Sequence, residues 1–194
     1  MGVSGTSDTA ILAAWAAHGV VTLWGQSSTK SAPVHAALQI ANLVEPLSVG
    51  SHSISRLPSG APRLTSSTEL HVSWSRAPGL WAATLGACPV GVDIERTRLR
   101  PMSLGLHARV FCSSVELELL GSCHAREHED VLLTIWSLKE AISKARGHGV
   151  ASVFREWTVW PPSRSSAPGI SATHTSYIAG RAVLNIALGR VLPP

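Results

Sequence analysis

The segment 90–95, Val-Gly-Val-Asp-Ile-Glu, constrains the fold of this chain more than any other stretch. Its apolar and acidic residues alternate, which predicts a β-strand, because successive side chains on a strand point to opposite faces. Val92 and Ile94 would then face a core. Asp93 and Glu95 would both project from the other face, where two carboxylates repel each other unless a cation lies between them. Oxygen ligands of this kind suit a hard divalent cation such as Mg²⁺.

A helix predicted over residues 131–145 supplies a third carboxylate. Glu140 falls nearly opposite the apolar stripe of this helix, and Lys144 follows one turn later on the same side. Gly147 then provides a stop signal. We therefore expect the stripe to be buried while Glu140 and Lys144 face solvent or a cleft. The residues at helical spacing that form the stripe are Val131, Ile135, Leu138, Ile142 and Ala145.

Each of these features has an ordinary explanation when taken alone. An Asp-x-Glu pair on a strand is often two solvated charges on an exposed face. A Glu–Lys pair four residues apart on a helix is often a surface pair worth about 0.2–0.5 kcal/mol. Together, however, Gly-Val-Asp-Ile-Glu at 91–95 and Trp-Ser-Leu-Lys-Glu-Ala at 136–141, followed by Lys144, form a recognisable pattern. This pattern resembles the 4′-phosphopantetheinyl transferase superfamily.

The resemblance implies an α+β fold of two similar α/β halves, a pseudo-dimer with antiparallel strands and a coenzyme A cleft between the halves. Residues 1–92 would form a shortened N-terminal half, and residues 93–194 the C-terminal half that carries the metal site. The larger branch of the family has this organisation and is monomeric, so we expect a monomer. The residue patterns elsewhere predict helices at 11–17, 34–44, 104–111 and 115–120, and strands at 20–24, 52–57, 70–75, 80–85, 156–160, 175–179 and 181–188.

The same resemblance gives roles to individual residues of the C-terminal half. The metal ligands of the family correspond to Asp93, Glu95 and Glu140, and the metal implied is Mg²⁺. The lysine four positions after the third ligand corresponds to Lys144, which would reach the diphosphate. Thr97, two residues after Glu95, would donate its hydroxyl to a phosphate oxygen.

Two upstream motifs of the family fall in frame but are altered here. Gly-Lys-Pro falls on residues 60–62, where Ala61 removes a lysine that contacts the nucleotide phosphate, although Arg63 is near enough in sequence to replace it. Ser-His-Ser falls on residues 75–77, where Arg76 replaces a phosphate-contacting histidine. Arginine keeps a donor and adds a permanent charge and a bidentate fork. The residues expected to bind coenzyme A are therefore Gly60, Arg63, Ser75, Arg76, Thr97 and Lys144.

A further acid of the family, usually four residues after a phenylalanine, is matched only approximately. Val115 stands four residues after Phe111, and Glu116 stands five after it. One residue on a helix is a rotation of about 100°, so Glu116 would need a one-residue insertion to occupy the family position. The sequence leaves a catalytic role for Glu116 open.

The reaction implied is transfer of 4′-phosphopantetheine from coenzyme A to a serine of an apo acyl or peptidyl carrier protein, releasing 3′,5′-ADP, as in a holo-[acyl-carrier-protein] synthase. Lys144 and Arg76 would stabilise the leaving nucleotide. The serine proton needs an acceptor, for which Glu140, Glu116 and a metal-bound water are candidates. The altered motifs leave an alternative, a catalytically impaired protein of the same fold that binds the carrier protein or coenzyme A. An unrelated metal-dependent phosphate-processing enzyme is a second alternative.

Charge and composition narrow the possible partners and the compartment. The formal net charge of +4 suits a phosphate-bearing substrate or an acidic protein. Arg96, Arg98 and Arg100 would meet the acidic helix of a carrier protein or form a solvated basic edge. The lysines and arginines form no dense patch, which argues against nucleic-acid binding. No apolar run reaches the ~20 residues that span a bilayer. Three cysteines without a Cys-x-x-Cys pair argue for a reducing compartment, so we expect a cytoplasmic protein.

Overall fold

The computed structural model describes residues 7–47, 51–67, 69–97, 104–124, 127–147, 154–160, 167, 170–178 and 182–189. It combines α-helices with antiparallel sheets, which confirms the α+β class expected from the sequence. One three-stranded sheet has the strand order β1-β5-β4, and a second has the order β6-β8-β7. The likeness of the two halves of the chain to each other stays a prediction.

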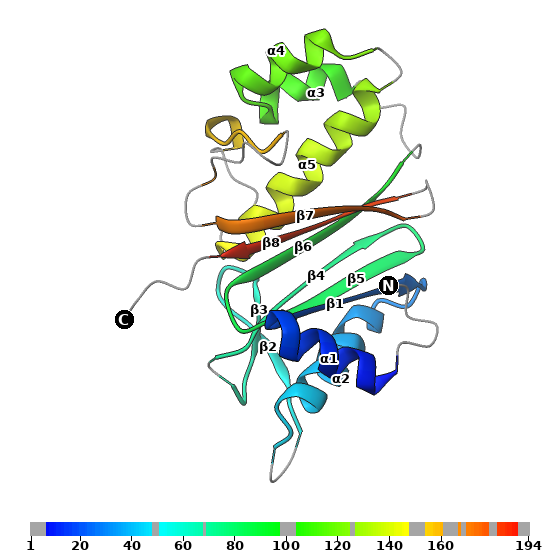
Figure 1. Cartoon of the computed structure of the whole chain (residues 1–194), viewed down its shortest axis with the longest axis vertical. Coiled ribbons are helices and arrows are strands. Elements are labelled where there is room, and N and C mark those ends of the chain that lie inside the picture. Colours follow the sequence, from blue (N-terminus) through cyan, green and yellow to red (C-terminus); the bar gives the residue numbers. More distant parts are fainter. Residues whose placement is uncertain are drawn as a thin grey trace.

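The first sheet is built from the N-terminal part of the chain. Figure 1 shows helices packed beneath it, and apolar side chains such as Ile40 and Leu85 join helix and sheet in one core. The strand predicted at 52–57 is shorter than expected, and its partner strand was not predicted. The elements of this part are α1 (Asp8–His18), β1 (Val20–Gln26), α2 (Ala32–Val44), β2 (Ile54–Arg56), β3 (Pro62–Leu64), β4 (His71–Ala77) and β5 (Leu80–Gly86).

The second sheet is covered by the long helix α5, with α3 and α4 beyond it (Figure 1). The predicted strand at 156–160 is wrong. Trp157 and Val159 are buried in the core around α5, so the alternating pattern reflects packing on helices rather than pairing in a sheet. The elements of this part are β6 (Val90–Arg96), α3 (Leu104–Phe111), α4 (Ser114–Ser122), α5 (His128–Ala145), the 3₁₀ helix η1 (Phe154–Glu156), β7 (Ile170–Ile178) and β8 (Ala182–Gly189).

Gly91 allows α5 to lie directly on strand β6. A Cβ atom at this position would clash with the Ala141 carbonyl oxygen and lie 2.6 Å from the Ala145 backbone nitrogen. Gly91 shares its face of the strand with Asp93 and Glu95, because side chains two residues apart point the same way. Helix α5 therefore covers the face that carries the two carboxylates.

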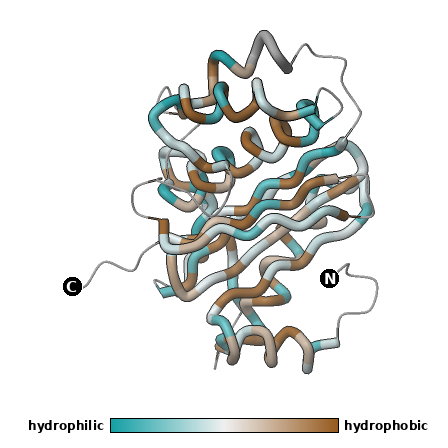
Figure 2. Tube along the Cα trace, turned by 45° about the horizontal axis from the view of Figure 1, so that its top comes forward, coloured by the Kyte–Doolittle hydropathy of each residue, from teal (hydrophilic) through white to brown (hydrophobic). Residues whose placement is uncertain are grey.

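The opposite face of β6 is apolar, as the alternation predicted. Val92 and Ile94 are fully buried in a cluster with Leu80 and Ala82 of the first sheet. Figure 2 shows that hydrophobic residues recur along the strands and the helices that cover them. All three cysteines are free, and within the described part of the chain no helix combines the length and apolar character needed to cross a membrane.

Candidate active site

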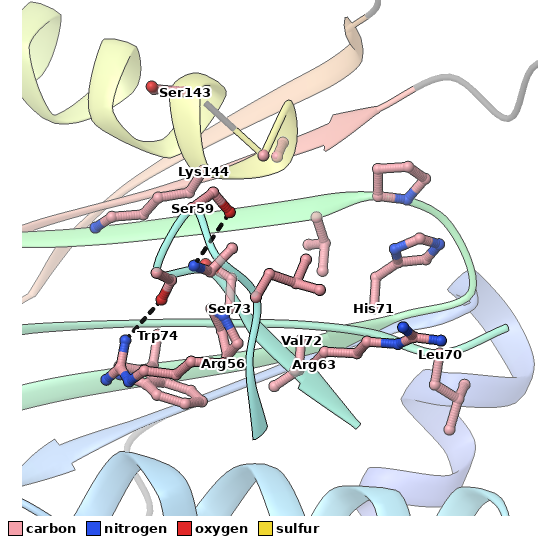
Figure 3. Close-up of a pocket in the computed structure, with 18 of the residues that line it drawn as sticks. Arg56, Ser59, Arg63, Leu70, His71, Val72, Ser73, Trp74, Ser143 and Lys144 are labelled. Atoms are coloured by element: carbon pink, nitrogen blue, oxygen red, sulfur yellow. Dashed lines mark hydrogen bonds between the residues drawn. The ribbon is translucent and has the colours of Figure 1, made fainter. Parts of the chain in front are cut away.

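A pocket of about 540 Å³ opens between the end of α5 and the β2–β3 hairpin. Figure 3 shows Lys144 on the helical side and Arg63 among the residues from the hairpin and β4 on the other side. Of the residues predicted from the sequence, Gly60, Arg63, Glu140 and Lys144 line it. Arg76 and Thr97 do not belong to the described residues of its wall.

Asp93 lies where β4, β6 and α5 meet, and only 3% of it is exposed. Its Oδ1 accepts hydrogen bonds from Ser75 Oγ and from Lys144 Nζ, each at 2.7 Å. Lys144 Nζ also donates to the Val92 carbonyl oxygen at 3.1 Å. The other carboxylate oxygen, Oδ2, is buried and has no partner among the described residues. Because such an atom is costly to leave unpaired, Oδ2 is available to a donor or a cation.

Glu95 and Glu140 interact electrostatically with Asp93. Burial and then the charge of Asp93 raise the pKa of Glu95 to about 7; a hydrogen bond with the Trp136 side chain and the charge of Lys144 oppose this increase, and Glu140 adds to it. Burial also raises the pKa of Glu140, opposed by Lys144 and reinforced by Asp93. The charge of Asp93 thus disfavours ionisation of both glutamates, and Glu140 disfavours that of Glu95.

The described side chains of Asp93, Glu95 and Glu140 are not arranged as a complete set of metal ligands. Among the residues whose placement is described, no group of three or more His, Cys, Asp or Glu side chains is arranged to hold an ion. The donor chemistry nevertheless fits a hard divalent cation, because carboxylate oxygens are its preferred ligands. The unpartnered Oδ2 of Asp93 is one such oxygen that could bind an ion without breaking an existing contact.

Glu116 has different surroundings. Its carboxylate is completely buried, and Oε2 accepts hydrogen bonds from Lys139 Nζ at 2.6 Å and from the Ser113 backbone at 2.8 Å. Its Oε1 accepts a hydrogen bond from the Val159 backbone at 2.7 Å. Both oxygens are therefore engaged in contacts that hold the C-terminal part together, and no described contact links Glu116 to Asp93.

The similarity to known proteins lies in the segment of the chain that carries Asp93, Glu95 and Glu140. The sequence model of the 4′-phosphopantetheinyl transferase superfamily matches residues 89–185, which is half of the 194 residues. This chain belongs to the 4′-phosphopantetheinyl transferase superfamily. The match begins just before β6 and ends within β8, so it contains Asp93, Glu95, Glu140 and Lys144.

Two curated members of the superfamily are similar to this chain over part of its length. The 4′-phosphopantetheinyl transferase ffp of Bacillus subtilis is 33% identical over 93 residues, which are 47% of this chain and 40% of that protein. The 4′-phosphopantetheinyl transferase Sfp of Bacillus subtilis strain 168 is 30% identical over 93 residues, with the same coverage of 47% and 40%. The similarity therefore spans two fifths of the length of these superfamily members.

The superfamily motifs did not indicate every residue of the site. Arg56 lines the pocket, its Nη1 donates to the Gly60 carbonyl at 2.7 Å, and its guanidinium carbon lies 5.4 Å from the ring centre of Trp74 (Figure 3). No local pattern predicts this contact, which joins a hairpin to a neighbouring strand. Of the basic edge expected at Arg96, Arg98 and Arg100, the last two lie outside the described residues.

Proposed function

We propose that this protein transfers 4′-phosphopantetheine from coenzyme A to a serine of an apo acyl or peptidyl carrier protein and releases 3′,5′-ADP. The observation that supports this most directly is the contact of Lys144 with Asp93 beside a pocket that Glu140 also lines. All three residues belong to the segment that matches the superfamily. Phosphoryl transfer depends mainly on positioning and charge neutralisation, which such a group of residues can supply.

Asp93, Glu95 and Glu140 are the residues that we propose as ligands of a divalent cation, with Mg²⁺ as the expected ion. The free Oδ2 of Asp93 and the raised pKa values of the two glutamates support this assignment. Glu140 is only half-buried and lines the pocket, so its side chain has space to adjust. The ion would supply charge neutralisation at the diphosphate.

The pocket is proposed to hold the coenzyme. Its volume of about 540 Å³ falls in the range of about 300–1,000 Å³ that is common for small-molecule sites. Arg56, Arg63 and Lys144 line it and provide positive charge for phosphate groups. Arg76 and Thr97 are proposed as phosphate contacts from the family motifs alone, and Ser75 is proposed to act through its hydrogen bond to Asp93.

Glu140 is proposed to accept the proton of the carrier serine. It lines the pocket, where a carboxylate oxygen can reach a bound substrate hydroxyl. Glu116 is less suitable because it is completely buried and both of its oxygens are already engaged.

Intact-protein mass spectrometry tests the proposal. Apo carrier protein incubated with coenzyme A, Mg²⁺ and this protein should gain the mass of one phosphopantetheine group. Asp93→Ala should abolish the gain, whereas Glu118→Ala, which removes an exposed carboxylate from α4, should leave it unchanged. An impaired binding protein would retain coenzyme A or carrier without any mass gain. A phosphate-processing enzyme of another kind would consume the nucleotide without a carrier.

A further inference from the structure

A row of three polar side chains, two of them buried and Thr175 half-buried, crosses the second sheet at Asp93. In the strand register, Asp93 of β6 is opposite Asn185 of β8, and Asn185 is opposite Thr175 of β7. Directly paired residues of antiparallel strands share one face, with Cβ atoms about 4.5–5.5 Å apart. Asn185 has no exposed surface. A neutral amide is thus held between a hydroxyl and a carboxylate in an interior layer of the protein.

Thr175 determines which way the amide of Asn185 points. Thr175 Oγ1 donates a hydrogen bond to Asn185 Oδ1 at 2.6 Å. Because the oxygen and the nitrogen leave opposite sides of the amide carbon, Nδ2 is directed away from β7 and toward the side of β6. The reverse orientation would bring the amide oxygen toward the Asp93 carboxylate, where both groups are acceptors. The Thr175 hydroxyl and the Asp93 charge therefore favour the same orientation.

Two buried atoms in this row have no partner among the described residues. They are Nδ2 of Asn185, which is a donor, and Oδ2 of Asp93, which is an acceptor. Folded proteins rarely leave such atoms unpaired. Because the two atoms belong to directly opposite residues of adjacent strands, a rotation of either side chain or one bridging water can join this donor to this acceptor.

Helix α5, which packs on this sheet, carries a third buried polar atom, Oγ of Ser137, that is also unpartnered in the described part of the chain. At one end of the sheet-facing stripe of α5, the Thr134 hydroxyl lies 3.2 Å from that of Tyr177 on β7. Two turns later the helix lies on Gly91 of β6. Ser137 lies between these two contacts along the helix, and Asn185 lies between them on the sheet.

We infer that Asn185 is a positioning residue for Asp93: its side-chain N–H, oriented by Thr175, binds one lone pair of Asp93 Oδ2 directly or through one water, fixes the carboxylate and leaves the second lone pair of Oδ2 to the cation. The inference rests on the proposed function, since it takes Asp93 as a metal ligand. Ligating carboxylates in proteins are usually held by outer contacts of this kind, and loss of such a contact typically weakens metal affinity by about 10–100-fold.

Direct titration with Mn²⁺ tests this role. The free ion is measured by electron paramagnetic resonance in the presence of coenzyme A. Asn185→Leu removes the amide at similar size and should weaken Mn²⁺ binding by about tenfold or more. Thr175→Val releases the amide and should weaken binding less, whereas Thr173→Val, at the same face of β7 opposite Ala187, should have no effect. Unchanged affinity in a folded Asn185→Leu protein would overturn the inference.

A second measurement needs neither metal nor turnover. In ¹⁵N spectra of the metal-free protein, the side-chain NH₂ signals of Asn185 should exchange slowly with solvent and shift in Asp93→Ala, but not in Thr173→Val. Signals that do not respond to Asp93→Ala would exclude the contact and with it the inference. The proposed function is tested by whether the wild-type protein modifies the carrier, and the role of Asn185 is tested by the two measurements above. Failure of one can therefore be told from failure of the other.

Discussion

The Lys139 ammonium group lies 2.6 Å from the Glu116 carboxylate, and both side chains are completely buried. Lys139 also donates to the carbonyl oxygens of Phe111 and Phe154, each at 2.7 Å, so all three of its N–H donors are used. The ammonium group of Lys139 on α5 thus joins α4 through the ion pair and α3 and η1 through its two hydrogen bonds to carbonyls. Because Lys139 directly precedes Glu140, the pair also fixes the part of α5 that carries a proposed metal ligand.

Removing one side of this pair should destabilise the protein strongly. Lys139→Met leaves the Glu116 carboxylate buried without a counter-charge, which typically costs about 3–5 kcal/mol. Adding Glu116→Gln removes the second charge and keeps a group that can bond to the backbone, so the double variant should recover much of the loss. Urea unfolding followed by tryptophan fluorescence measures both. A loss in Lys139→Met no larger than in the exposed control Glu118→Ala would contradict this expectation.

Gly91→Ala should disrupt the contact between α5 and β6. The new Cβ would meet the backbone at Ala141 and Ala145, and overpacking of this kind costs about 1–3 kcal/mol or more. The same displacement should move Lys144 from Asp93 and reduce carrier modification. The matched control is Gly121→Ala in α4, where a Cβ meets nothing within 4 Å and stability should rise by about 0.5–1 kcal/mol. Equal stability of the two variants would show that the close approach is unnecessary.

Local patterns predicted the parts of the structure that depend on local periodicity. The alternation at 90–95 identified β6 and its buried face, and helical spacing identified α5. The same reasoning failed at 156–160, because alternating burial also arises when an irregular segment packs on a helix. Periodicity reports which side chains are buried, not which element buries them.

Contacts between distant segments had no signal in the sequence. Glu116 was a candidate for catalysis because of its distance from a phenylalanine, but its engagement with Lys139 depends on how α4 meets α5. Helix α5 was expected to bury one stripe, yet it is covered on two sides, so polar residues such as Ser137 are buried as well. The contact of Arg56 with Trp74 likewise requires a hairpin and a strand to meet.

Glu95 should make the metal-free protein less stable as the pH rises through neutrality. Burial and Asp93 raise the pKa of Glu95 from its ordinary value of 4.5 to about 7, so the folded state binds this proton more tightly than the unfolded state. The resulting stabilisation is complete below about pH 4.5 and is lost as the pH rises through about 7.

Urea unfolding between pH 4.5 and 8 in the presence of EDTA measures this effect. Glu95→Gln should flatten the dependence on pH, although Glu140, whose pKa is also raised, will retain part of it. Glu118→Gln, at an exposed position, should follow the wild-type profile. If Glu95→Gln also followed that profile, the carboxyl group of Glu95 would not be titrating as described.

The arginines that line the pocket should contribute more to coenzyme A binding than an arginine outside it. Arg56, Arg63 and Arg76 are all exposed, but Arg56 and Arg63 line the pocket, whereas Arg76, on β4, does not belong to the described residues of the wall. A hydrogen bond to a charged group is worth about 1.5–3 kcal/mol, and exposure to solvent reduces this value. The family motif, by contrast, predicts a phosphate contact for Arg76.

Arg56→Gln and Arg63→Gln should therefore each raise the KM for coenzyme A by about three- to tenfold, which corresponds to about 0.7–1.4 kcal/mol, and leave the KM for the carrier protein unchanged. Arg76→Gln should have a smaller effect. Steady-state kinetics at low and high salt provide the measurement, since the differences should shrink as salt screens exposed charges. If Arg76→Gln raised the KM more than either pocket variant, the nucleotide would bind along β4 as the motif suggests, and the pocket would not be its main site.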